Sequence, residues 1–151
     1  MRWVTTANVH FDRVASPWLI KRFVDPEAEF LFVARDQVDQ RPPDAIPVAI
    51  PGATLGPHDE NGTTFEKIIK EYNLQDPALD LMARVVASGV NYAVHDYHPP
   101  SDDRYGQMAV GYLAFQDGMI LFKDTDAERL EASYVAYDCL YALFKANRQR
   151  G

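Results

Sequence analysis

The sequence has little cysteine and no long apolar run, and each shortage excludes a class of protein. Its 151 residues include one cysteine, Cys139, so no disulfide can form within the chain. No apolar run approaches the ~20 residues that span a bilayer, and the first residues lack the apolar stretch of a secretory signal. We therefore expect a soluble, cytoplasmic protein that makes no contact with a membrane.

Positive charge is also scarce. The formal net charge is −7, whereas a nucleic-acid surface needs a basic stripe, so we expect no nucleic-acid partner. The sequence contains no HExxH, CxxC or glycine-rich phosphate motif, which removes support for zincin, dithiol-redox and nucleotide-binding functions. Cys139 lies in an apolar helical pattern with no neighbouring histidine, which predicts a buried, inert thiol.

Apolar residues make up 47% of the chain, enough for one packed core, and we predict one domain over residues 1–151. β-Prone segments predict strands at 3–6, 29–33 and 47–50. Helices are expected at 16–25, 63–73, 76–88, 105–115 and 126–147, the first with Ser16 as its N-cap and Pro17 at its first position. The fold class is α+β, with a small sheet of short strands, about five helices and a long C-terminal helix. Two long loops, 51–62 and 89–103, both carry histidine, and long loops are often functional.

All four histidines lie beside acidic residues. Imidazole and carboxylate together form divalent metal sites and also act as general acids and bases. His10 follows the first strand and precedes Asp12, so the pair could bind one ion, or Asp12 could orient the ring of His10. The alternative for Asp12 is an ion pair with Arg13 or a place at the helix N-terminus.

The remaining three histidines lie in or near the two long loops. His58 precedes Glu66, which is either a metal ligand or the N3 residue of a capping box with Thr63. His95 and His98 are three residues apart and can chelate one ion only if the loop bends. The alternative is that both are surface residues.

Two further charged residues border predicted helix faces. Asp138 lies at the edge of the buried stripe of the last helix, where a carboxylate needs a partner. A tyrosine hydroxyl or an arginine would suffice, and a ligand or base role is the alternative. Arg22, four residues after Trp18, either stacks over that indole or holds an anionic substrate as a fork.

Residues 9–33, VHFDRVASPWLIKRFVDPEAEFLFV, resemble the chromate-resistance ChrB family, whose C-terminal domain carries the pattern HxDRxAxxWLIxRFxDPxAEFxFV. Later segments agree: LGPH with TFE at 55–66, VHD at 94–96 and YDCLY at 137–141. The resemblance implies a link to chromate resistance or sensing. The N-terminal half of full-length family members, credited with regulatory DNA binding, has no counterpart in these residues. Because its polar motif positions coincide with His10, His58, Glu66, His95 and Asp138, it adds weight to them.

These observations predict a small metal-dependent enzyme, a hydrolase, lyase or isomerase, that acts on a small anionic substrate. A divalent ion such as Zn, Mn or Fe would be bound by His10, His58 and Glu66, with His95 and His98 in reserve. Arg13 or Arg22 would orient the anion, and Asp12 and Asp138 are further catalytic candidates. The alternatives are a non-catalytic module that binds a metal or an oxyanion such as chromate, and a plain interaction protein with surface histidines. A homo-oligomer is left open.

Overall fold

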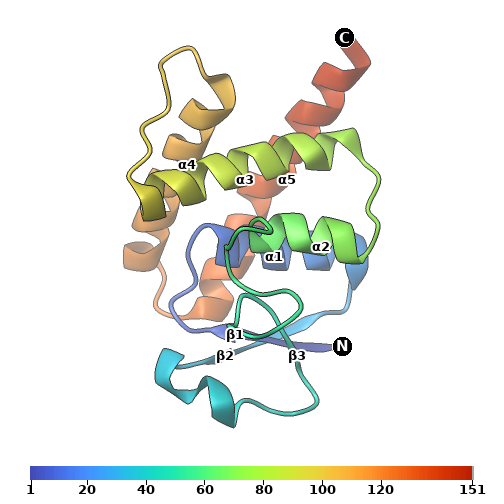
Figure 1. Cartoon of the computed structure of the whole chain (residues 1–151), viewed down its shortest axis with the longest axis vertical. Helices are drawn as coiled ribbons and strands as arrows, with labels where there is room; N and C mark the ends of the chain where they lie inside the picture. Colours follow the sequence, from blue (N-terminus) through green and yellow to red (C-terminus); the bar gives the residue numbers. More distant parts are fainter. Residues whose placement is uncertain (151) are drawn as a thin grey trace.

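A small parallel sheet lies at one end of the molecule and helices cover it (Figure 1). The computed structural model describes residues 1–150, with side chains through residue 147, and Gly151 lies outside this range. The strands are β1 (Arg2–Thr6), β2 (Glu29–Val33) and β3 (Ile46–Pro47), in the order β2-β1-β3. The helices are α1 (Asp12–Leu19), the π-helix η1 (Ile20–Val24), the 3-10 helix η2 (Arg35–Gln40), α2 (Thr64–Glu71), α3 (Pro77–His95), α4 (Arg104–Phe122) and α5 (Asp126–Arg150).

Successive side chains of a strand point to opposite faces of the sheet. Both faces of β1 are buried, since Trp3, Val4, Thr5 and Thr6 are all buried. Trp3 belongs to the main core beneath the helices, whereas Val4 belongs to a smaller cluster with Ala45 and Ile50. The strand predicted at 47–50 is shorter in the structure: Ala49 has a positive φ of 58°, which turns the chain out of the sheet. Pro47 is tolerated because β3 is an edge strand.

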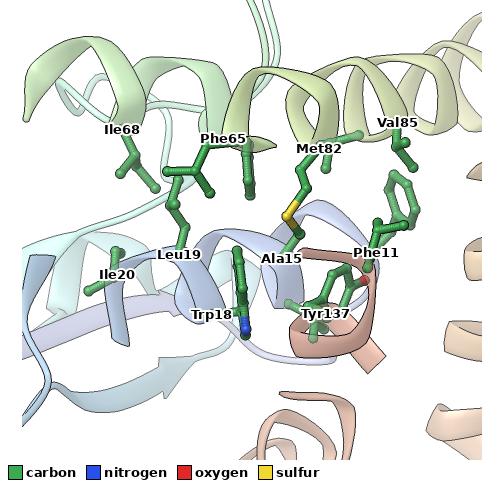
Figure 2. Close-up of a cluster of buried hydrophobic side chains, with 14 of the residues drawn as sticks. Phe11, Ala15, Trp18, Leu19, Ile20, Phe65, Ile68, Met82, Val85 and Tyr137 are labelled. Atoms are coloured by element: carbon green, nitrogen blue, oxygen red, sulfur yellow. The ribbon is translucent and has the colours of Figure 1, made fainter. Parts of the chain in front are cut away.

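The main core joins α1 to α2, α3 and α5. Figure 2 shows that Leu19 of α1 points toward Phe65 and Ile68 of α2, whereas the indole nitrogen of Trp18 points away from α2 and α3, on the side of α5. Tyr137 of α5 packs against the Trp18 ring. The side chains that fill this space share near-complete burial and come from segments far apart in the sequence: Phe11, Ala15, Trp18, Leu19, Ile20, Phe65, Ile68, Met82 and Tyr137.

The prediction that Ser16 and Pro17 begin the first helix was wrong. The helix begins at Asp12, and Pro17 lies inside it. Ser16 is fully buried, and its hydroxyl donates to Asp12 Oδ1 at 2.7 Å instead of capping a helix. Because proline lacks an N–H, the regular hydrogen-bond ladder is weakened there, and α1 gives way to η1 at Ile20. As predicted, the helical segment ends before Asp25.

Two later boundaries also differ from prediction. Residues 89–95, expected in a loop, continue α3 to His95, and the chain turns at Asp96, which has a left-handed φ of 52°. The helix expected at 105–115 extends to Phe122 because Gly111 and Gly118 do not interrupt it. The helices predicted from Thr63 and Asp76 are confirmed, with both residues as N-caps.

The long C-terminal helix is confirmed, and its predicted face packs into the core, with Tyr141 partly buried. Cys139, however, is exposed, so its predicted burial was wrong. It shares the outer side of α5 with Val135, four residues earlier, which is 65% exposed. The α+β fold class is confirmed. Within the described residues, no helix is long and apolar enough to cross a membrane.

Candidate functional site

A cavity of about 440 Å³ lies at the carboxyl ends of the three strands. Thr6 is the last residue of β1, and Arg35 and Ala49 follow the ends of β2 and β3 by two residues each. Open parallel sheets commonly bind ligands at this edge. The cavity is lined by Thr6, His10, Phe11, Asp12, Arg13, Arg35, Val38, Ala49, Pro51, Pro57, His58, Thr64, Val90, Ala93, Val94 and Leu113.

The turn between β1 and α1 is held in an unusual conformation. Phe11 has a φ of 47° and a ψ of −99°, a strained backbone for an aromatic residue. Its ring lies so close to Gly89 of α3 that an added Cβ would overlap Phe11 Cζ. The carboxylate of Asp126 accepts hydrogen bonds from the N–H groups of Asn8 and Val9, both at 2.9 Å. These contacts fix His10 and Asp12, which flank Phe11.

His10 is paired with an acid from a distant helix. Its Nε2 lies 2.7 Å from Oδ1 of Asp117 on α4, and its side chain is 26% exposed. Asp12, the orienting partner considered from the sequence, makes its own contacts elsewhere. In the neutral ring an Nε2–H that donates to Asp117 leaves the lone pair on Nδ1. His10 therefore has the orienting carboxylate of an acid–base histidine.

Asp12 connects α1 to the N-terminus of α2. It retains some exposed surface at the cavity, but protein atoms surround its carboxylate. Its oxygens accept hydrogen bonds from Ser16 Oγ at 2.7 Å and from the Thr64 N–H at 3.2 Å. Burial raises the pKa of Asp12, and these hydrogen bonds only partly oppose that effect. Asp12 was predicted to lie at a helix N-terminus. It is the first residue of α1, and it also accepts a hydrogen bond at the N-terminus of α2.

Arg13 places a positive charge behind the cavity. Its Nη1 donates to Thr6 O, Thr6 Oγ1 and Ala7 O at 2.9–3.1 Å, and its Nη2 donates to Asn8 O. Burial and the nearby Arg35 lower the pKa of Arg13, but a guanidinium stays charged at neutral pH. Among the described side chains, neither Arg13 nor Arg35 forms a salt bridge within 4 Å. Their charges therefore remain available to a bound anion.

His58, which lines the cavity, contacts His95 at the end of α3. Their Nε2 atoms are 3.4 Å apart, and their rings form an edge-on contact. Two nitrogens bound at 2.0–2.1 Å to one tetrahedral ion lie about 3.3–3.4 Å apart, so this separation fits two ligands of a single ion. The Nδ1 atom of His58 is buried and has no hydrogen-bond partner among the described residues. A metal-bound His58 would therefore lack the hydrogen bond at Nδ1 that usually orients a ligating ring.

Glu66 forms the capping box that was one of its two predicted roles. Its Oε1 accepts from the N–H of Thr63 at 3.0 Å and from Thr63 Oγ1 at 3.1 Å, while the Glu66 N–H donates to Thr63 Oγ1. Glu66 is not in the cavity lining. The capping interactions thus occupy Oε1 of Glu66.

His98, Arg22 and Asp138 lie outside the cavity. His98 is 68% exposed, contacts Asp96 at 3.0 Å and packs edge-on against Tyr92. Arg22 forms a two-pronged pair with Asp138, with N–O distances of 2.9 and 3.0 Å. Arg22 lies over Tyr134 and not over the indole expected from the sequence.

The Trp18 indole completes that pair by donating to Asp138 Oδ1 at 2.7 Å. The hydrogen bonds from Arg22 lower the pKa of Asp138, and the hydrogen bond from Trp18 adds a smaller effect in the same direction. This is the arginine partner anticipated for a carboxylate at the edge of the buried stripe. The pair joins α1–η1 to α5.

The structure thus separates the nine candidate residues into two groups. His10, Asp12, Arg13 and His58 line one cavity, and His95 joins them through His58, whereas Glu66, His98, Arg22 and Asp138 have structural contacts elsewhere. Among side chains of residues 1–147, no three His, Cys, Asp or Glu groups are close enough to hold a metal ion as a preformed set.

Sequence reasoning missed Asp117 and Arg35. Asp117 gave a weak signal, since it is the sole acidic residue of segment 104–122. Arg35 gave no such signal, because its place depends on the order of the strands.

Comparison with known proteins agrees with the resemblance seen in the sequence. The family model described as ChrB, C-terminal domain, matches residues 3–144. Protein ChrB of Cupriavidus metallidurans is 37% identical over 75 residues, which cover 50% of this chain and 22% of that protein. The chain thus aligns with about a fifth of its relative's length. No solved structure matches. Since the family model covers nearly all of the chain, the protein belongs to the ChrB C-terminal domain family.

Proposed function

We propose that this domain is a small enzyme that binds a small anion in the cavity and acts on it by acid–base chemistry with the help of a divalent metal ion. The observation that carries this proposal is the convergence of His10, Asp12, Arg13 and His58 on one cavity at the carboxyl ends of the strands. Perturbed pKa values in a cleft of this kind are typical of functional sites.

Anion binding is supported by charge. Arg13 and Arg35 provide two guanidinium groups without a carboxylate in contact. Asp12 and Thr64 are the first residues of α1 and α2, so two helix N-termini lie at the cavity, where the Asp12 carboxylate accepts from the Thr64 N–H. The net charge of the chain is −7, so two arginines in one cavity lining depart from the acidic character of the chain as a whole.

His10 is the proposed general base. Asp117 fixes the ring through Nε2, and the Nδ1 lone pair would accept a proton from the substrate. Asp12, whose pKa is raised by burial, is the proposed second acid–base group. These residues would bind and orient the substrate, and Nδ1 of His10 would hold its proton.

The proposed metal ligands are His58 and His95, with positions left for water or substrate. When bound, a Zn, Mn or Fe ion would act as a Lewis acid on the anion. The separation of 3.4 Å between the two Nε2 atoms fits this role. A substrate bound in the adjoining cavity would provide a further ligand.

The test is metal content and turnover in matched variants. Protein purified without added metal is assayed for transition metals alongside His58→Ala, His95→Ala and the control His98→Ala, whose ring lies outside the cavity. We expect the first two to lose the metal and His98→Ala to retain it. We also expect a metabolite screen to identify a compound that the protein consumes. Turnover of this compound should fall at least 100-fold in the His10→Gln variant. Equal metal content in all variants would contradict the metal assignment.

One observation favours a second candidate, a non-catalytic module that binds a metal or an oxyanion such as chromate in resistance or sensing. Among the described residues, the imidazoles of His58 and His95 are close enough to bind one ion, and no third ligand joins them. Catalytic zinc sites usually have three protein ligands. Saturable binding of metal or chromate without consumption of any screened compound would favour this module over the enzyme.

A further inference from the structure

The shape and lining of the cavity carry information about which anion it accepts. The volume of about 440 Å³ lies in the range of roughly 300–1,000 Å³ typical of pockets for organic ligands. A tetrahedral oxyanion, with one central atom and its oxygens, would fill only a small part of this space. The remaining volume therefore needs a second component of the ligand.

The lining is divided between polar and apolar elements. The polar side chains come mainly from the turn after β1, where His10 lies, and from the start of α1, where Asp12 and Arg13 lie. Apolar side chains come from the C-terminal part of α3, where Val90 and Val94 lie, and from Leu113 of α4. A ligand that matches both parts has a charged head and an apolar body.

The hydrogen bonds of Arg13 limit the charge of the head. Most of its donors already bind the carbonyl groups of Thr6, Ala7 and Asn8, so it has few N–H groups left for a multiply charged oxyanion, which presents more acceptors than a carboxylate. A doubly charged oxyanion against an apolar wall would also lose hydration without replacement hydrogen bonds. A singly charged carboxylate has fewer acceptors to satisfy.

We propose, on the basis of the function proposed above, that the natural ligand is a small organic monoanion: a carboxylate on an aromatic ring or branched aliphatic chain. The carboxylate lies toward Arg13, Arg35 and His10, and the apolar body contacts Val90, Val94 and Leu113. Bare chromate or sulfate is a poor match for this cavity.

Titration calorimetry with paired probes tests this assignment. Phenylacetate and acetate share a head and differ in the apolar body, while sulfate and chromate are tetrahedral oxyanions. We expect phenylacetate to bind at least tenfold more tightly than the other three. Val94→Thr should weaken phenylacetate binding about threefold. Val135→Thr is the matched control, since Val94 and Val135 are 64% and 65% exposed but only Val94 lines the cavity.

The charge component is tested with Arg35→Gln, which should weaken both carboxylates, and with Arg104→Gln, an exposed arginine outside the cavity, which should not. If acetate, sulfate or chromate binds as tightly as phenylacetate, the assigned ligand class is wrong while the anion site stands. If no probe binds at millimolar concentration, both this inference and the proposed anion site are contradicted.

Discussion

Asp12 shows how the burial of a single carboxylate can oppose folding at neutral pH. Burial raises its pKa in the folded protein above the unfolded value near 3.8, so the folded state binds this proton more tightly. The ionised carboxylate therefore lowers the free energy of unfolding at neutral pH. That cost is absent below the unfolded pKa, where the group is protonated in both states.

The first prediction concerns Asp12→Asn. Asparagine can accept from the Thr64 N–H and donate to Ser16 Oγ, so both contacts are kept without the buried charge. We expect Tm at pH 7 to rise by about 2–4 °C, or about 1 kcal/mol for a domain of this size, while turnover is lost. Thermal unfolding at pH 7 and at pH 3 measures this. An equal shift at both pH values would contradict the assigned origin.

The pKa of Asp138 is shifted in the opposite direction to that of Asp12, so the ionised Asp138 carboxylate stabilises the folded state. Arg22 lowers the pKa of Asp138 below its unfolded value, so the stabilisation is complete above about pH 4 and is lost as the pH falls through the folded pKa. We predict that Asp138→Asn lowers stability at pH 7 by about 0.5–1 kcal/mol, a modest effect because both side chains are partly exposed. In denaturant unfolding, adding Arg22→Gln to this variant should change little further. Additive losses would argue against coupling of the two.

At the scale of elements, the sequence predicts most helices and strands because their signals are local. Thr63 and Asp76 are capping residues followed by apolar periodicity, and both helices begin where expected. The start of α1 could not be predicted this way. It depends on Phe11 adopting a positive φ, which the distant Gly89 makes possible by leaving room for the ring.

This contact gives a prediction about helices α3 and α4. Gly89→Ala would normally favour a helix by about 1 kcal/mol, but here the added Cβ overlaps the Phe11 ring. We expect a net loss of about 1–3 kcal/mol and a weakened anion site, because His10 and Asp12 flank Phe11. Gly111→Ala is the control: nothing lies within 4 Å of its added Cβ, so chemical denaturation should show it stabilised by up to about 1 kcal/mol. Equal responses of the two variants would show that the ring does not constrain Gly89.

The N-terminus of α2 gives a prediction that separates capping from metal binding. Glu66→Ala removes one half of the capping box and should lower the free energy of unfolding by about 1 kcal/mol. Metal content should stay as in the parent protein, since His58 and His95 are intact. Loss of metal from a folded Glu66→Ala protein would restore Glu66 as a ligand.

At the scale of the whole molecule, the candidate site could be predicted only in part. The residue types in the site were visible in the sequence, because His10, Asp12, Arg13 and His58 stand out as polar motifs. Their partners were not, since Asp117 reaches His10 across 107 positions and His95 reaches His58 across 37. Such pairings depend on helix packing, which no local pattern encodes.

The central claim is that the cavity at the carboxyl ends of the strands binds an anion. Three histidines provide a direct test, because His10 and His58 line the cavity while His98 lies outside it. Phenylacetate is titrated into protein carrying ¹⁵N-labelled histidine, with ring signals assigned from His→Ala variants. The account predicts that the His10 and His58 signals move saturably while the His98 signal stays in place. Unchanged signals throughout, or a His98 shift as large as that of His10, would contradict it.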